Sequence, residues 1–299
     1  MKDISTKIEE RLSYFILVVP ALILYYYVMA FPTFFSVGLS LTNYSGGKVF
    51  GNPDFGFVGL KNYKTIFVDR YFYLALKNNL WIVLVSVFGQ IPLGFILAYI
   101  LSRGLVKGTD FFQTVIYLPN VIAAVIIGTL FNKFFLSANS VSLEIQRLFN
   151  PAAEFELMKN PMLPVLAVIL WMYTGTYVII FLANIQKIDN AVIEASLIDG
   201  ATEGQTLRYI ILPALSGVIV TCAILAISGS LQAFDLIYVM TQGGPAHRTS
   251  VLALYTYEKA FKGAPNYPVA NAISTVTVII SFLLIVITQV TEKIFSSGD

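Results

Sequence analysis

Reactive side chains are scarce in this chain of 299 residues. It holds one cysteine, Cys222, and one histidine, His247, so it offers neither a thiol pair nor a His/Cys ligand set for a metal ion. The sequence contains no phosphate-binding loop of the form G-x-x-x-x-G-K-[ST] and no G-x-G-x-x-G turn after a strand. The chain therefore lacks the usual devices for binding ATP, and if ATP drives it, another polypeptide must bind that ATP.

Polar and aromatic residues inside apolar stretches are the next candidates for a site. Asp235 adjoins such a stretch, and two interpretations stay open for it: a helix-end residue that reaches water, or an ion site. The uncharged candidates are Asn120, Trp171, Tyr173, Thr174, Tyr177, Ser230 and Gln232. In a helix, Tyr173, Thr174 and Tyr177 fall at i, i+1 and i+4, so we expect them on one face. These residues either line a pocket for an uncharged polar solute, or mark membrane interfaces and bond neighbouring helices.

A second group of residues forms an organised pattern over 185–213. Asp189 predicts the N-cap of a helix over 190–199, and Gly200 stands where a helix ends in a left-handed residue. Residues 202–205 fit a capping box that begins a second helix. We expect a helix-turn-helix elbow outside the bilayer, whose small residues let another surface approach its backbone. The alternative is that this segment is only a connector.

The elements that must position these residues are those of a membrane protein. Only 12% of the residues are charged, whereas a soluble domain has about 25%, and the mean hydropathy is +0.76. The uncharged runs longer than the roughly 20 residues that cross a bilayer core are 12–47, 78–102, 111–132, 160–186, 209–234 and 263–291. The sequence thus predicts an all-α integral membrane protein that forms a single domain over 1–299. We place its six transmembrane helices near 14–41, 79–101, 112–132, 163–183, 215–234 and 271–290.

Charge defines the orientation of these spans only in part. Lys2, Lys7 and Arg11 precede the first span and favour a cytoplasmic N-terminus. The numbers of Lys and Arg residues in the segments on the two sides of the membrane do not favour that orientation. The apolar run after Arg11 is much longer than the core of a signal peptide, so we expect it to remain as a span. A net charge of +2 is too small and too dispersed to indicate a nucleic-acid partner.

Residues 194–213 carry a resemblance to a known family. The residues involved are Glu194, Ala195, Ser196, Gly200, Ala201, Ile210, Leu212 and Pro213. Their spacing resembles the EAA loop, E-A-A-x3-G-x9-I-x-L-P, of permease subunits in binding-protein-dependent ABC importers, with Ser196 in place of the second alanine. The similarity extends over nearly the whole chain and is closest to the sugar-importer subfamily of maltose- and glycerol-phosphate-type permeases. Further matching segments are 57–63, 118–120 and 243–245.

This resemblance implies a type I ABC importer permease fold in which two permease subunits form one translocation pathway. It implies cytoplasmic ATPase subunits that accept the elbows and hold ATP and magnesium, with no cofactor or metal in this chain. It also implies an extracytoplasmic solute-binding protein, and a bacterial or archaeal cytoplasmic membrane with both termini of the chain in the cytoplasm. The candidate coupling residues are then Glu194, Ala195, Ser196, Asp199, Gly200 and Ala201.

The resemblance also implies a sugar as the solute. Aromatic faces and neutral hydrogen-bonding groups bind sugars, whereas charged groups are costly at membrane depth. Maltose-type permeases line their cavity with the regions that match Asn120, Tyr173, Thr174, Tyr177, Ser230 and Gln232. The alternative function is an ion- or proton-coupled secondary carrier, which needs buried carboxylates that the predicted spans lack. A membrane-embedded enzyme would need a nucleophile, base or metal set, and the spans offer none.

Overall fold

The computed structural model describes residues 2–44, 46–47, 55–136, 140–149 and 160–296, and over these residues the fold is helical. The chain divides into two compact units, one of residues 1–68 and 256–275, the other of residues 69–255 and 276–299. The single permease domain over 1–299 stays a prediction.

The first unit begins with α1 (Lys2–Tyr25), the π-helical turn η1 (Tyr26–Ala30), α2 (Phe31–Ser40) and α3 (Lys61–Val68). The buried Asn62 joins these elements, because its Nδ2 donates to the carbonyl oxygens of Ser40 and Thr42 at 2.7 and 2.8 Å. Those carbonyls follow the end of α2, where helix carbonyls lack partners of their own. The hydroxyls of Ser40 and Tyr63 lie 2.6 Å apart and add a second link.

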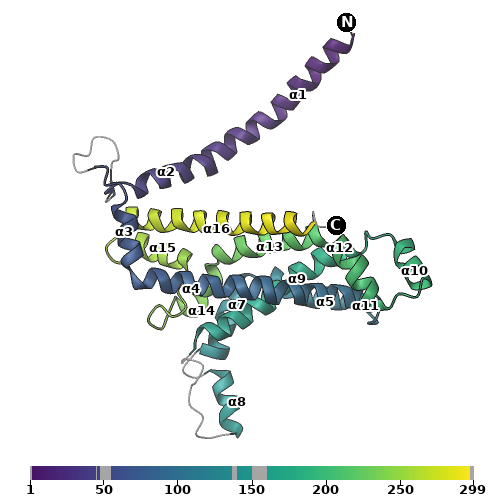
Figure 1. The fold of residues 1–299 in the computed structure, drawn as a ribbon. Helices are drawn as coiled ribbons and strands as arrows, with labels where there is room; N and C mark the ends of the chain where they lie inside the picture. Colours follow the sequence, from purple (N-terminus) through teal and green to yellow (C-terminus); the bar gives the residue numbers. More distant parts are fainter. Residues whose placement is uncertain (1, 45, 48–54, 137–139, 150–159, 297–299) are drawn as a thin grey trace. The chain divides into compact units, whose positions relative to one another are not determined.

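The second unit holds most of the helices (Figure 1). Its first half contains α4 (Arg70–Val85), η2 (Ser86–Gln90), α5 (Ile91–Ser102), α6 (Thr109–Val121), α7 (Ala124–Phe131), η3 (Asn132–Leu136) and α8 (Val141–Phe149). Then follow α9 (Met162–Ile185), α10 (Asn190–Ile198), α11 (Glu203–Thr206), η5 (Leu207–Ile211), α12 (Leu212–Ala214), α13 (Ser216–Leu231) and α14 (Asp235–Thr241). The helices α15 (Leu252–Phe261) and α16 (Tyr267–Ser296) each run through the boundary between the units.

The predicted all-α membrane fold is confirmed. The described helices long and apolar enough to cross a membrane are Tyr14–Ser40, Arg70–Ser102, Met162–Ile185 and Tyr267–Thr291, and a fifth candidate segment, Ala124–Leu148, runs across residues outside the described ranges. The segments Glu203–Ala214 and Ser216–Leu231 meet at 65° and give a sixth if they count as one bent span.

Two predicted spans differ from the observed helices. The span expected over 112–132 is not one helix, because Ile122 and Ala123 are extended, with ψ of 135° and 133°, and separate α6 from α7. Neither residue is Gly or Pro, and the local sign of a break in the apolar run is Pro119, which lies inside α6 three residues before Ile122. The second helix begins at Arg70 instead of 79, because Asp69 Oδ1 accepts the backbone N–H of Tyr71 at 2.9 Å and caps it there.

Three π-helical turns share one cause. Each of η1, η2 and η5 ends two residues before a proline: Pro32, Pro92 and Pro213. A proline inside a helix has no N–H, and its ring clashes with the carbonyl four residues earlier. The chain relieves this clash by widening the turn. The N–H of the residue before the proline then donates to the carbonyl five residues earlier, as the N–H of Ile91 does to the carbonyl of Ser86.

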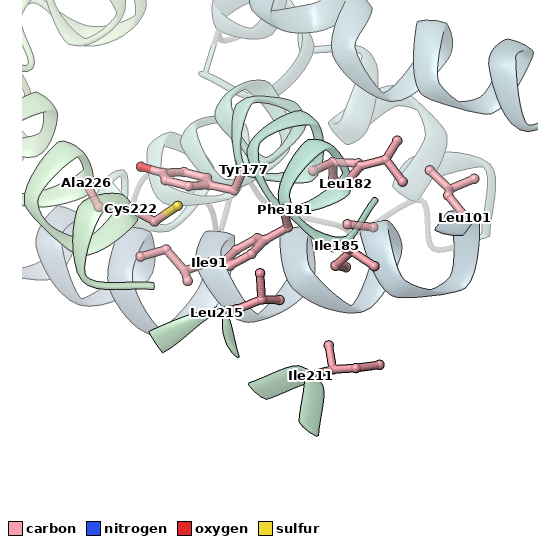
Figure 2. Packing of buried hydrophobic residues seen from close by; sticks show 12 residues of the cluster. Ile91, Leu101, Tyr177, Phe181, Leu182, Ile185, Ile211, Leu215, Cys222 and Ala226 are labelled. Atoms are coloured by element: carbon pink, nitrogen blue, oxygen red, sulfur yellow. The ribbon is translucent and has the colours of Figure 1, made fainter. Parts of the chain in front are cut away.

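The core of the second unit joins α5, α9 and α13 (Figure 2). Tyr177 and Phe181 of α9 pack against Ile91 of α5 and Cys222 of α13. The same cluster continues through Leu182 and Ile185 to Ile211 and Leu215, next to the predicted elbow. A continuous apolar core therefore links the middle of α9 with the base of the elbow.

A smaller cluster brings the last helix of the chain onto this core. Val83 of α4 packs with Ile227 and Leu231 of α13, and Ile280 and Leu284 of α16 lie against them. In Figure 1 the run α4–η2–α5, α13 and this part of α16 lie roughly alongside one another.

Candidate functional site

A cavity of about 420 Å³ lies between α4–η2, α9, α13 and α14. Its polar lining consists of Ser86, Gln90, Tyr173, Thr176, Tyr177, Ser230, Gln232 and Asp235. Its apolar lining includes Ile82, Ile169, Leu225, Phe234 and Ile237. A mainly apolar wall that carries a few convergent polar groups is typical of small-molecule sites.

The two tyrosines come from one face of α9, four residues apart. Gly94 of α5 allows this face to lie close to its neighbour, because a Cβ at Gly94 would be only 2.6 Å from the Cβ of Tyr177. Tyr177 is therefore buried, at 6% exposure, while it still lines the cavity.

Serine hydroxyls close the cavity on another side. The Ser86 and Ser230 oxygens lie 3.1 Å apart and join η2 to α13, and both side chains are buried. Ser230 also donates to the carbonyl of Ala226 at 2.6 Å. Asp235 is exposed on the first turn of α14, so its carboxylate lies at a helix N-terminus, where negative charge is favourable.

The structure brings four predicted pocket residues together at this cavity: Tyr173, Tyr177, Ser230 and Gln232. Thr174 and Asn120 are not among its lining residues. Thr174 is buried and donates to the carbonyl of Leu170 at 2.5 Å within its own helix. Thr174 and Thr176 are turned by similar angles from the two tyrosines, in opposite directions around the helix. The cavity lies on the Thr176 side, so Thr176 lines it and Thr174 does not.

Sequence reasoning missed Ser86, Gln90 and Thr176, and it left the place of Asp235 open. A glutamine within the uncharged run 78–102 was the available signal. The sequence did not show that this run and α9 face the same space.

The elbow has the local structure that its sequence predicts. Asp189 Oδ1 accepts the N–H of Ala191 at 2.9 Å and caps α10. Gly200 has a φ of +84°, and the N–H groups of Gly200 and Ala201 bond back to Leu197 and Ser196 at 3.1 and 2.9 Å. This pair of bonds is the Schellman ending of a helix.

The second arm of the elbow begins with the predicted capping box. Thr202 and Gln205 bond each other's backbone N–H groups through their side chains and start α11. The Ser196 hydroxyl, at the position that departs from the EAA pattern, lies 3.1 Å from the Thr206 hydroxyl. Ser196 thus braces α10 against α11 and does not point outward.

The outer surface of the elbow is open. Glu194, Ala195, Asp199 and Gly200 are exposed, and the apolar Ile198 is 86% exposed. A surface hollow of about 340 Å³ adjoins the bend and is lined by Asp199, Gly200, Ala201, Gln205, Thr206, Tyr209 and Ile210.

One ion pair connects the elbow to the end of α5. Arg103 Nη2 lies 3.2 Å from Glu203 Oε1, with side-chain exposures of 22% and 65%. An exposed pair of this kind contributes about 0 to 1 kcal/mol to stability, so it adds little to the stability of the fold.

Comparison with known proteins identifies the family. Residues 90–298 match the model of the binding-protein-dependent transport system inner membrane component. The chain belongs to this family.

Its relatives are permease subunits. It is 31% identical to the probable ABC transporter permease protein YurN of Bacillus subtilis, over 97% of this chain and 98% of the relative. It is 34% identical to the multiple sugar-binding transport system permease protein MsmF of Streptococcus mutans, over 88% and 89% of the two chains. The predicted carbohydrate-type ABC permease family is therefore confirmed, and this multi-pass membrane protein is a permease component and not an ATPase.

A solved structure agrees with the fold. A chain from a bacterial ABC transporter involved in the import of the acidic polysaccharide alginate has a TM-score of 0.79 to this protein. The two chains are 22% identical, and the match covers 97% of this chain and 98% of the other. The type I importer permease fold expected from the sequence is confirmed.

Proposed function

We propose that this permease forms part of the translocation pathway of an ATP-driven sugar importer and couples it to an ATPase through the elbow over 185–213. A second permease subunit completes the pathway, ATPase subunits bind ATP and magnesium, and an extracytoplasmic binding protein delivers the sugar. In this arrangement the elbow and both termini are cytoplasmic. A relative named as a multiple sugar-binding transport permease supports a sugar as the solute.

The observation that carries the coupling proposal is the continuous core below the elbow. Ile211 and Leu215 at its base belong to the same buried cluster as Tyr177, which lines the cavity (Figure 2). Close-packed side chains transmit displacement, because they leave little space to absorb it. Movement of the elbow by an ATPase would thus reach the cavity wall.

Charge reversal on the elbow tests the coupling. We expect Glu194→Lys to weaken co-purification of the ATPase on the order of 10-fold or more, because it replaces an exposed carboxylate at the docking surface. Sugar uptake should fall with it. Glu144→Lys is the matched control, an exposed glutamate on α8, and should leave both unchanged. Normal co-purification and uptake in the Glu194→Lys variant would contradict the role of the elbow.

The cavity is the proposed sugar site, and aromatic truncation tests it. Tyr173→Ala and Tyr177→Ala should each lose about 1 to 3 kcal/mol of solute affinity, on the scale of stacking on aromatic side chains. Gln232→Ala should also slow uptake measured at saturating loaded binding protein. Trp171→Ala is the control, because Trp171 lies on the same helix but is absent from the cavity lining. If all three cavity variants transport at the parental rate, the sugar site lies elsewhere.

A further inference from the structure

Gln90 is a buried polar side chain whose place in the fold calls for a ligand. It is the last residue of η2, two residues before Pro92, and only 2% of it is exposed. Burial of a carboxamide is unfavourable unless its groups form hydrogen bonds.

One contact fixes the orientation of the Gln90 carboxamide. Its Nε2 donates to the backbone carbonyl of Ile169 on α9 at 2.7 Å. A carbonyl can only accept, so the amino group must face Ile169 and the carboxamide oxygen must face away from it.

The carboxamide oxygen of Gln90 opens into the cavity. Among the described residues, the Gln90 side chain forms one hydrogen bond, the one from its Nε2 to Ile169. Within the described residues, the side-chain polar atom that is both fully enclosed and without a partner is Oγ of Ser250. Oε1 of Gln90 also has no partner there, so it is not fully enclosed by protein. Because Gln90 lines the cavity and is otherwise buried, the accessible surface of Oε1 faces that cavity.

We propose that Gln90 selects the solute by accepting a hydrogen bond from one of its hydroxyl groups. The inference rests on the proposed sugar site and adds a contact from the second span to those from α9 and α13. The bond to Ile169 prevents the carboxamide from turning its amino group into the cavity. The site therefore favours a group that donates a hydrogen bond at this point, and it disfavours a deoxy or O-methyl derivative.

The prediction concerns selectivity and not only rate. A deoxy sugar leaves Oε1 without a donor, and an unsatisfied polar group costs about 1 to 3 kcal/mol. We therefore expect on the order of 10-fold slower uptake of the analogue that lacks the hydroxyl read by Gln90, since 1.4 kcal/mol is a factor of 10.

The first experiment uses the complete reconstituted transporter with saturating loaded binding protein. Radiolabelled maltose, lactose and trehalose identify a transported sugar, and each monodeoxy analogue of that sugar is then compared with it. In Gln90→Met, a side chain of similar length without polar atoms, the discrimination at one position should disappear. Gln113→Met is the control, because Gln113 lies on α6 outside the cavity lining. It should keep the parental discrimination.

A structural role for Gln90 predicts a different result. If its amide only braces α5 against α9, Gln90→Met slows all analogues equally and keeps the parental ratios, which would overturn the inference. Failure of the sugar-site proposal has its own signature: parental uptake in Tyr173→Ala, Tyr177→Ala and Gln232→Ala.

A second experiment remains informative if Gln90→Met assembles poorly. The native Cys222 is fully buried and can be replaced, which gives a Cys222→Ala background for the variant Gln90→Cys. A small thiol reagent should modify the new cysteine in the assembled transporter, and the transported sugar should slow that reaction severalfold. The sugar should not protect a Gln113→Cys control. A thiol at position 90 that resists modification, or that the sugar does not protect, would overturn the inference.

Discussion

Two glycines of the elbow separate the effect of backbone conformation from the effect of space. A Cβ at Gly200 or at Gly204 would meet no atom within 4 Å. Gly200 has a φ of +84°, whereas Gly204 lies within α11. A side chain at Gly200 is thus disfavoured by the left-handed backbone alone, by about 1 to 2 kcal/mol.

This difference gives a matched test of the elbow geometry. We expect Gly200→Ala to distort the bend and reduce ATPase co-purification, and Gly200→Val to reduce it further, because a branched side chain is less tolerant of positive φ. Gly204→Ala should leave co-purification unchanged, because alanine favours a helix over glycine by about 1 kcal/mol. Pull-down of the ATPase from membranes measures the result, and equal behaviour of the two alanine variants would contradict the assignment.

At the level of the helices, glycines set how closely α9 approaches its neighbours. Gly94 of α5 faces Tyr177, and Gly175 of α9 faces the backbone of α6, where a Cβ would lie 2.5 Å from the carbonyl oxygen of Ile116. Small residues at such crossings let transmembrane helices pack closely. The position of the tyrosine face therefore depends on residues that carry no side chain.

The α5–α9 crossing yields a stability prediction. Gly94→Ala should lower the free energy of unfolding by about 1 to 3 kcal/mol, as expected when extra volume enters a packed site. Thermal denaturation of the detergent-purified protein measures the change. Gly38→Ala is the control, because a Cβ at Gly38 on α2 meets nothing within 4 Å. An unchanged midpoint for Gly94→Ala would show that the helices separate without cost.

A second link between elements depends on Asn79, which is fully buried on α4. Its Nδ2 donates to the carbonyl of Ser230 at 2.8 Å, and its Oδ1 accepts the N–H of Leu252 at 2.7 Å. One amide thus satisfies the end of α13 and the start of α15, two places where helices lack partners of their own.

Loss of this amide should be more harmful than loss of a similar one elsewhere. Asn79→Leu leaves two buried backbone groups without partners, each at a cost of about 1 to 3 kcal/mol. Asn184→Leu removes an amide that donates to Ile180 within its own helix at 2.8 Å and accepts a long 3.5 Å bond from the exposed Lys187 just after that helix, so it should have a smaller effect. The yield of folded protein and its melting midpoint compare the two variants, and a similar midpoint for both would refute the role of Asn79 as a link.

Across the second unit, the run α4–η2–α5 connects three regions with different tasks. Asn79 holds the ends of α13 and α15, Gln90 lines the cavity, and Arg103 follows α5 and pairs with Glu203 of the elbow. Under the proposed coupling, this run would carry a displacement of the elbow toward the cavity.

The chain alone is expected to be inactive. Liposomes that contain only this protein should neither hydrolyse ATP nor accumulate labelled maltose, lactose or trehalose, because the sequence has no phosphate-binding loop and its predicted spans hold no carboxylate. Addition of the ATPase, the second permease and the binding protein should restore both activities. Uptake driven by a proton or sodium gradient in the single-protein liposomes would favour the secondary carrier instead.

By itself the sequence determined the features that depend on neighbouring residues. The absence of charge located most of the spans, because an unpaired charge is excluded from a bilayer core, but it did not show that the run 112–132 holds two helices. The capping box at Thr202 and the left-handed Gly200 were predictable because their hydrogen bonds close within one turn.

Only the tertiary structure decided which residues meet at the cavity. In a soluble helix, polarity separates the buried face from the solvent face. In α9 both the lipid-facing and the buried sides are apolar, so the pattern could not show that Thr176 lines the cavity and Thr174 does not. The contribution of Gln90 depends on the packing of α5 against α9, between residues 79 positions apart. Such contacts follow from how the helices cross, which the spacing of residues along one helix does not encode.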